Sequence, residues 1–302
     1  MKHNKIDLHM HSSYSKDGQY TPSELVKLCS DNGLKIIAIS DHNSVLAIEE
    51  ARQSVIDQGL DLKVIPAIEI DCDYQGINLH ILGYGIDPHE PWFSSYEAHI
   101  NKEEQEGSLI RTKKLRELGL HFDQHELDKI AIDGVLTGEM LAEVAMEDPR
   151  NQDHPILLPY REGGPRSDNP HLNFYWDWCA QGKPAFAATH LVTAQEAILR
   201  IKEAGGFAVF AHPGNNIKMD TVLLEGILDL GLDGIEVYSS YHKPEVVAYY
   251  REKAIHHNKL LTLGSDYHGK TKPSIKLGEF HCLDEKALTE AFLNRPEIKS
   301  WL

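Results

Sequence analysis

Short apolar runs typical of strands alternate with helical patterns at both ends of this 302-residue chain. The helical pattern over residues 21–33 is sharply bounded, because Thr21 and Glu24 form a capping box, Pro22 occupies the first helical position and Gly33 follows the end. The apolar strand runs indicate strands buried on both faces, as in a parallel sheet covered by helices. The expected strands cover residues 5–11, 35–40, 62–70, 77–86, 207–212, 234–239 and 260–266.

The alternation of strands and helices is interrupted once, in the middle of the chain. This stretch begins with the charged helical run "EAHINKEEQEGSLIRTKKLRELG" and continues into a segment rich in Pro, Gly and polar residues, "RNQDHPILLPYREGGPRSDNPHLN". Two blocks of βα units with one interruption predict a single α/β barrel that carries a mostly helical insertion. We therefore assign residues 1–100 and 186–302 to the barrel and residues 101–185 to the insertion.

Charge and composition exclude several classes of protein. The net charge of -16 argues against a surface that binds duplex DNA, which requires a positive footprint. No apolar run approaches the roughly 20 residues that span a bilayer, and the N-terminus lacks the apolar core of a signal peptide, so we expect a cytoplasmic protein without membrane contact. The four cysteines include no C-x-x-C pair, which gives no sign of a disulfide framework or a thiolate zinc site. The 18 histidines, many beside Asp or Glu, favour binding of divalent metal ions.

Metal-ligand residue types recur at the ends of the predicted strands. In parallel βα barrels the C-terminal ends of all strands open on one face, where catalytic residues gather. A single histidine at such a place is usually a hydrogen-bonded core residue, but a repeated pattern of this kind predicts a metal site. The candidates are His9, His11, Asp41, His42, Glu69, His80, His212, Glu236, Asp266 and His268.

The last predicted strand leads into a loop that also fits a phosphate-binding pattern. Residues 264–271, "GSDYHGKT", satisfy the expression G-x-x-x-x-G-K-[ST]. A true phosphate loop leads into a helix, whereas here Pro273 follows two residues after Thr271. Asp266 and His268, two residues apart at a strand end, share a face and favour a metal site instead.

Six motifs in order resemble those of the PHP (polymerase and histidinol phosphatase) family of metal-dependent phosphoesterases. The resemblance covers roughly residues 1–100 and 190–285 and implies a distorted (β/α)7 barrel with two or three divalent ions of Mn, Fe or Zn. The motifs are "DLHMHSSYSKDG", "AISDHNS", "AIEI", "LHILGYG", "FAHPG" and "GSDYHG".

The resemblance also implies which residues hold the metals. A first ion would be bound by His9, His11, Glu69 and Asp266, and Glu69 would bridge to a second ion. The second ion would be held by His80 and His212, and a third by Asp17, His42 and His268. Asp41 and Glu236 would orient the imidazoles from behind, and Asp41 is also a possible auxiliary catalytic group.

A metal-bridging hydroxide is the expected nucleophile, because closely spaced metal ions activate a shared water for in-line attack on phosphorus. The expected activity is hydrolysis of small phosphate esters, either nucleotide phosphates or cyclic and diester sugar phosphates. Two alternatives stay open: a noncatalytic metal-binding PHP module and an amide hydrolase on a similar barrel.

The insertion is expected to select the substrate. Small nucleotide phosphatases of the family often carry an Arg-Pro-His motif there, and the comparable stretch of this chain is "GVLTGEMLAE". Basic candidates for contacting the substrate phosphate are Arg161, Arg166, Lys183 and His190, of which His190 is also a possible auxiliary catalytic group.

Overall fold

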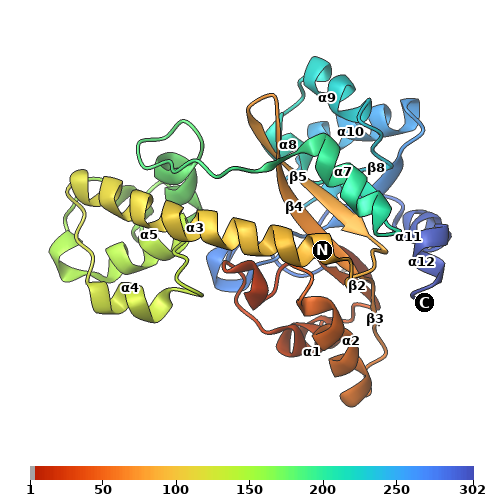
Figure 1. Ribbon diagram of the computed structural model, residues 1–302, viewed down its shortest axis with the longest axis horizontal. Coiled ribbons are helices and arrows are strands. Elements are labelled where there is room, and N and C mark those ends of the chain that lie inside the picture. Colours follow the sequence, from red (N-terminus) through yellow and green to blue (C-terminus); the bar gives the residue numbers. More distant parts are fainter. Residues whose placement is uncertain (1–3) are drawn as a thin grey trace.

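The computed structural model describes residues 4–302 and shows a mixed α/β body from which a helical lobe extends (Figure 1). The strands are β1 (Ile6–Met10), β2 (Ile36–Ile39), β3 (Lys63–Val64), β4 (Ala67–Tyr74), β5 (Ile77–Tyr84), β6 (Val192–Thr193), β7 (Phe207–Phe210), β8 (Gly234–Ser239) and β9 (Leu260–Gly264). They form a three-stranded sheet of order β1-β2-β3 and a six-stranded sheet of order β6-β4-β5-β7-β8-β9. The predicted mixture of parallel strands and helices is confirmed.

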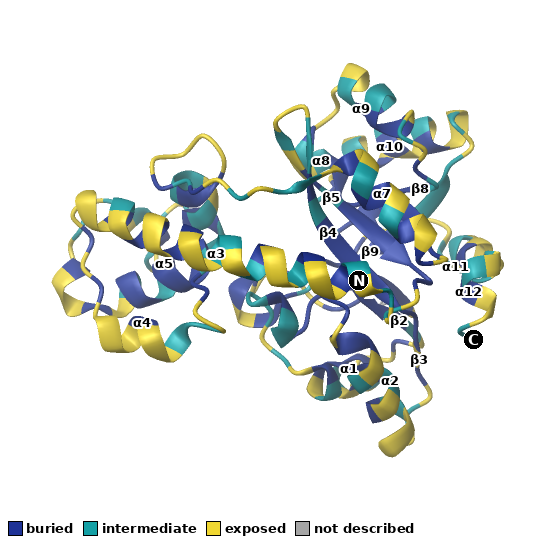
Figure 2. Ribbon diagram, viewed as in Figure 1, coloured by how far each residue is buried: buried dark blue, intermediate teal, exposed yellow. Residues whose placement is uncertain are grey.

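Helices cover the sheets, and the strands between them are almost wholly buried (Figure 2). The helices of the body are α1 (Pro22–Asp31), α2 (Ala47–Asp57), α7 (Ala194–Glu203), α8 (Pro213–Asn216), α9 (Thr221–Leu228), α10 (Pro244–His256), α11 (Glu285–Leu293) and α12 (Pro296–Lys299). Helix α7 packs on β4, β5 and β7, and α10 packs on β8 and β9. No helix within residues 4–302 is long and apolar enough to cross a membrane.

The two sheets meet at two places. An isolated parallel bridge joins Met10 to Tyr267, and a second joins His42 to Glu69. At the first junction the backbone N–H of Asp266 also donates to the carbonyl of His9. These junctions bring the end of β1 beside the end of β9 and the end of β2 beside β4, which is the geometry that gathers the candidate site residues.

Strand β5 departs from the expected parallel order. It pairs antiparallel with β4 and with β7, because β4 and β5 form a hairpin. The hairpin turn consists of Gln75 and Gly76, with φ values of 55° and 81°. Two consecutive residues with positive φ are typical of the two-residue turn that matches strand twist. The sequence left too few residues between these strands for a helix, and that spacing signals the hairpin.

The middle of the chain forms the helical lobe, which has an apolar core of its own. Helix α3 (Pro91–Glu117) begins on the body and runs without a break through the predicted boundary at residue 100 into the lobe (Figure 1). Leu115, Leu141 and Phe174 are among the buried residues of the lobe's core. The other elements of the lobe are α4 (Gln124–Ile130), α5 (Gly138–Glu147), α6 (Pro170–Phe174), the short turns η2 (Pro149–Asn151) and η3 (Leu158–Tyr160), and the π-helical turn η4 (Tyr175–Cys179).

Candidate metal centre and its cavity

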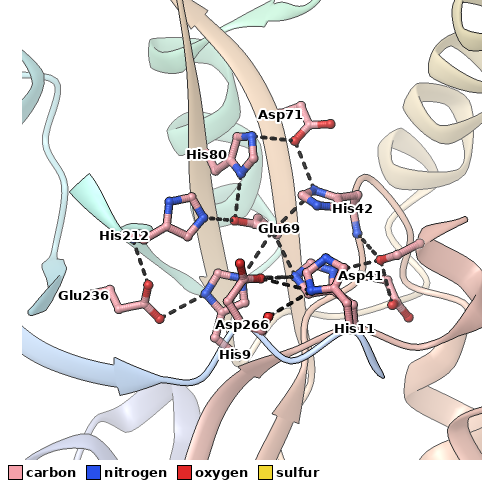
Figure 3. Close-up of polar contacts among 12 residues, drawn as sticks. His9, His11, Asp41, His42, Glu69, Asp71, His80, His212, Glu236 and Asp266 are labelled. Carbon is pink, nitrogen blue, oxygen red and sulfur yellow. Dashed lines mark hydrogen bonds and ion pairs between the residues drawn. The ribbon is translucent and has the colours of Figure 1, made fainter. Parts of the chain in front are cut away.

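The predicted ligands converge on one point where the two sheets meet (Figure 3). Apart from Asp17, which lies in the loop between β1 and α1, they come from strands or from the residues that follow them. The contributing segments are β1 and its end, the turn after β2, β4, β5, the end of β7 and the loop after β9. The rigid strands therefore hold the imidazoles and carboxylates in fixed directions.

The first predicted ligand set, His9, His11, Glu69 and Asp266, lies together in the buried interior. Nε2 of His9 is 3.2 Å from Oε2 of Glu69 and 3.3 Å from Oδ1 of Asp266. Nε2 of His11 is 3.2 Å and 3.0 Å from the same two oxygens. All four ligand atoms lie within 4.8 Å of one another.

The second predicted set uses the other oxygen of Glu69. Oε1 of Glu69 is 3.0 Å from Nδ1 of His80 and 3.1 Å from Nε2 of His212. Glu69 is fully buried between the two sets, so a single carboxylate faces both of them. The resemblance implied a bridging role for Glu69, and that role stays a prediction.

The third predicted set gathers Asp17, His42 and His268, with His11 beside them. Oδ2 of Asp17 is 3.1 Å from Nε2 of His268. The rings of His11 and His268 stack with their centroids 4.0 Å apart. The loop residue Asp17, which carries little signal by itself, is therefore brought to the cluster.

Asp71 joins the cluster and was missed from the sequence. Its Oδ1 lies 3.1 Å from Nδ1 of His42 and 3.4 Å from Nε2 of His80. Asp71 follows Glu69 by two residues on β4, so the two side chains share a face of the strand. The same period-two argument that linked Asp266 to His268 could have found it.

The hydrogen bonds of the imidazoles show that this cluster suits cations. Nδ1 of His9 is 3.0 Å from the Glu236 carboxylate, which can only accept, so Nδ1 carries a proton and Nε2 faces the carboxylate oxygens of Glu69 and Asp266. Acceptors that face acceptors at this distance repel one another unless a cation lies between them. Within residues 4–302, Oδ1 of Asp17, Oε2 of Glu69, Oδ1 of Asp266 and Nε2 of His268 are buried without a hydrogen-bond partner. Buried polar atoms are rarely left so, and imidazole and carboxylate are ligands of Zn, Mn and Fe.

Glu236 and Asp41 support the histidines from behind. Besides contacting His9, Glu236 accepts a hydrogen bond from the backbone N–H of His212 at 2.8 Å. Asp41 accepts from Ser15 Oγ at 2.9 Å, and Ser15 Oγ lies 2.8 Å from Nδ1 of His11. Asp41 thus reaches an imidazole through a serine, whereas Glu236 contacts one directly.

The second oxygen of Asp266 is held by two residues that were not predicted. Oδ2 of Asp266 accepts hydrogen bonds from Tyr241 Oη at 2.5 Å and from Lys272 Nζ at 2.7 Å. Lys272 is buried, and its ammonium also lies 5.6 Å from the centre of the Tyr241 ring. These contacts direct the free oxygen of Asp266 toward His9 and His11.

Charges within the cluster shift its pKa values. Burial alone would raise the pKa of Asp266, but the Lys272 ammonium and the His268 ring hold it well below its usual value. Burial likewise opposes ionisation of Glu69, yet His9 and other rings hold the pKa of that carboxyl well below its usual range. Both carboxylates are therefore ionised and ready to bind cations at neutral pH.

Close packing under the cluster requires a glycine. A Cβ on Gly264, at the end of β9, would lie 2.2 Å from Cβ of His9 and 2.7 Å from Oε1 of Glu236. Two residues later, Asp266 has φ of 57°, a left-handed conformation that costs a non-glycine residue of order 1–3 kcal/mol. The loop after β9 is thus shaped to point Asp266 at the histidines.

Comparison with known proteins gives the family. The PHP domain model matches residues 7–138, which include the ends of β1, β2, β4 and β5 that carry this cluster. The chain carries a PHP domain.

Full-length relatives support the same assignment. The 5'-3' exoribonuclease Rnm of Salmonella typhimurium is 28% identical over 90% of this chain and 87% of its own. The 3',5'-nucleoside bisphosphate phosphatase of Chromobacterium violaceum is 28% identical over 87% of each chain. A solved structure from Bifidobacterium adolescentis, a proposed metal-dependent phosphoesterase, superposes with a TM-score of 0.75 at 25% identity and covers 95% of each chain. These two relatives, a nuclease and a phosphatase, both act on phosphoester bonds.

The G-x-x-x-x-G-K-[ST] match of this PHP chain does not build a phosphate loop. Gly269, Lys270 and Thr271 form a single 3-10 turn, η5 (Gly269–Thr271), and no α-helix follows it until α11. Nζ of Lys270 points to Glu143 of α5, with both carboxylate oxygens at 3.0 Å. The loop instead carries Asp266 and His268 into the PHP cluster.

The PHP cluster opens into a cavity with two lobes. The α5 lobe, of about 240 Å³, lies toward α3 and α5 and is lined by residues that include Glu97, Arg111 and Glu139. The α8 lobe, of about 310 Å³, lies toward β5 and α8 and is lined by residues that include Asn78 and Asn216. The lobes share His42, His80, Leu172, Tyr175, Trp176 and Lys272.

Of the predicted substrate residues, only Lys183 reaches this cavity, where it lines the α8 lobe. Arg166 forms two hydrogen bonds with Asp177, both at 3.1 Å, and Arg161 donates to backbone carbonyls within the helical lobe. His190 is exposed and lies 2.8 Å from Glu103 of α3. Arg161, Arg166 and His190 line neither cavity lobe.

Proposed function

We propose that this chain hydrolyses a small phosphate ester at a centre of two or three divalent metal ions. The observation that carries the proposal is the convergence of the three ligand sets with carboxylate oxygens of Asp17, Glu69 and Asp266 buried and unpartnered. Such an arrangement is electrostatically unfavourable without cations and suits Mn, Fe or Zn.

The proposed ligands follow the three sets. His9, His11, Glu69 and Asp266 would hold the first ion, Glu69, His80 and His212 the second, and Asp17, His42 and His268 the third. Asp71 faces His42 and His80 and adds a carboxylate between the second and third sets.

Metal ions held by these residues would supply an activated water and positive charge beside the phosphoryl oxygens. The chain's own residues prepare that chemistry. Glu236 fixes the tautomer of His9, while Tyr241 and Lys272 fix the rotation of Asp266. Lys272 also lines both lobes, so its ammonium is placed to attract a phosphoryl group.

The shape of the cavity supports a small substrate. Its lobes, of about 240 and 310 Å³, suit a nucleotide or sugar phosphate, a choice that agrees with the nucleotide substrates named for the Chromobacterium relative. We further propose that the two sheets, joined by the two isolated bridges, form the distorted (β/α)7 barrel that the resemblance implies. In this proposal the helical lobe, residues 101–185, selects the substrate.

Metal analysis combined with a substrate screen tests this function. We expect the purified protein to contain two or three equivalents of Mn, Fe or Zn by mass spectrometry. We expect phosphate release from at least one phosphomonoester, dinucleotide or cyclic phosphate, and loss of that release in a chelator. Metal binding without any phosphate release would favour a noncatalytic module, and cleavage of amides alone would favour an amide hydrolase.

A further inference from the structure

The α5 lobe contains a buried carboxyl group that forms no ion pair within the described residues. Glu139 is 9% exposed, lies in the first turn of α5 and lines the lobe. None of the lysines, arginines and histidines within residues 4–302 forms an ion pair with it. The three cations that line the lobe are held by other carboxylates: Lys16 by Asp133, Arg111 by Glu104, and Lys272 by Asp266.

The position of Glu139 is fixed by packing at the start of α5. A Cβ on the preceding residue, Gly138, would lie 2.8 Å from Cδ2 of Tyr175 and 2.9 Å from Cβ of Cys179. The first turn of α5 therefore lies directly against η4. The backbone that carries Glu139 therefore cannot shift away from a ligand without disturbing the lobe's core.

The α8 lobe has the opposite character. Apart from the cluster histidines, Asp266 and Lys272, its polar lining consists of amides and aromatic side chains with polar groups together with Lys183, which is exposed and forms no ion pair with any residue of 4–302. Apart from Asp266, a proposed metal ligand, no carboxylate lines it. The amides are supplied by Asn78, Gln181, Asn215 and Asn216.

We propose that Glu139 is a specificity-determining residue that admits an uncharged or ammonium-bearing leaving group to the α5 lobe and rejects a second phosphoryl group there. The inference rests on the proposed function and names the substrate class of the same site. A buried carboxylate repels a dianion strongly, and specificity commonly depends on such a repulsive element. An ammonium group would instead supply the missing partner of Glu139.

Binding of nonhydrolysable phosphonates tests the proposal without requiring turnover. The probes share a three-carbon chain and differ only at its far end: 3-aminopropylphosphonate, propylphosphonate and propane-1,3-diylbisphosphonate. Titration calorimetry on the metal-loaded protein should show tightest binding of the amine and weakest binding of the bisphosphonate. In Glu139→Gln, which keeps the size of the side chain, the ratio of the two dissociation constants should fall at least tenfold.

A matched control lies on the same helix. Glu147→Gln changes the exposed last residue of α5, outside both lobes, and should leave the ratio unchanged. Metal content and circular dichroism of both variants establish that the cluster and the fold are intact. A ratio that stays within twofold in Glu139→Gln, equal effects of the two variants, or wild-type preference for the bisphosphonate would each overturn the proposal.

Turnover separates this inference from the function on which it rests. If wild-type protein releases phosphate from no ester, the proposed function fails, while the phosphonate ratio still reports on Glu139. If it is active, Glu139→Gln should raise kcat/KM for a nucleoside 3',5'-bisphosphate relative to the corresponding monophosphate at least tenfold. An unchanged relative rate would overturn the assignment of Glu139 even in an active phosphoesterase.

Discussion

The metal cluster and the helical lobe face each other across one cavity but are built in different ways. The cluster's side chains extend from strands and from residues just beyond them, and His9, Glu69 and His268 are fully buried. The lobe presents residues of helix ends and loops, such as Glu139 and Trp176, from a separate apolar core. The difference suggests that the cluster fixes the chemistry, whereas the lobe adjusts what reaches it.

The first prediction removes a carboxylate from the cluster itself. Asp266→Asn should lower kcat by about 10³-fold, because a metal ion contributes several kcal/mol of charge stabilisation in the transition state. It should also lower the metal content by about one equivalent while circular dichroism stays unchanged. Steady-state kinetics with metal analysis measure both effects, and Asp61→Asn, at an exposed surface ion pair, is the control. Full activity with full metal content would remove Asp266 from the ligand set.

The second prediction concerns charge on the lobe's side of the cavity. Burial, together with the charge of Asp17, raises the pKa of Glu139 from its ordinary value of 4.5 to about 7. Between about pH 4.5 and pH 7, Glu139 is therefore protonated in the folded state and ionised in the unfolded chain. Its contribution to the free energy of unfolding is fully present below about pH 4.5 and is lost as the pH rises through about 7.

The glutamine of Glu139→Gln does not ionise. The free energy of unfolding of this variant, relative to that of wild type, should therefore grow as the pH rises from about 4.5 to 7. The increase should be on the order of 3 kcal/mol in the free energy of unfolding. Urea unfolding of the chelator-treated proteins at a series of pH values measures it. Glu147→Gln should track wild type, and a constant difference between Glu139→Gln and wild type would show that Glu139 ionises normally.

The third prediction tests the residue that links the two regions. Lys272→Met should lower kcat/KM by about 30-fold, on the order of 2 kcal/mol, the scale of a hydrogen bond to a charged group. Its ammonium both holds Asp266 and lines the two lobes. Lys270→Met is the matched control, because that side chain is half exposed and pairs with Glu143. If Lys270→Met lost activity and Lys272→Met did not, Lys270 rather than Lys272 would be the lysine of this loop that supports catalysis.

The proximity of most candidate ligands could be predicted because each is marked by the strand pattern directly beside it. A ligand at the end of a buried strand is marked by its own apolar run, as at His212 and Asp266, and all three predicted sets lie together. Glu139 carries no such mark, since an acid in the first turn of a helix is usual at an exposed surface too. Its importance depends on the packing of α5 against η4, which distant residues determine.

The fold was predictable to a similar extent. Alternating elements gave the strands and helices, but β5 was expected in a parallel sheet and is antiparallel, because its direction depends on the two-residue turn at Gln75 and Gly76. Pairing partners also escaped prediction. Asp177, the partner of Arg166, is just one of many acids in an acidic chain, so Arg166 looked available to a phosphate.

The last and smallest effect is expected for Arg166 itself. Its guanidinium joins the loop before α6 to Asp177 of η4, with both partners more than a third exposed, so solvent screens the pair. Arg166→Ala should therefore lower the free energy of unfolding by less than about 1 kcal/mol, the range of exposed ion pairs. Its kcat/KM should stay within about twofold of wild type for every ester, since a surface substitution away from the site seldom costs more.

Arg150→Ala is the matched control, because Arg150 also belongs to the helical lobe but pairs with Asp148, only two residues away. A tenfold loss of kcat/KM in Arg166→Ala alone would mean that Arg166 exchanges Asp177 for the substrate phosphate, and selection by the lobe would then depend on attraction there as well as on repulsion at Glu139.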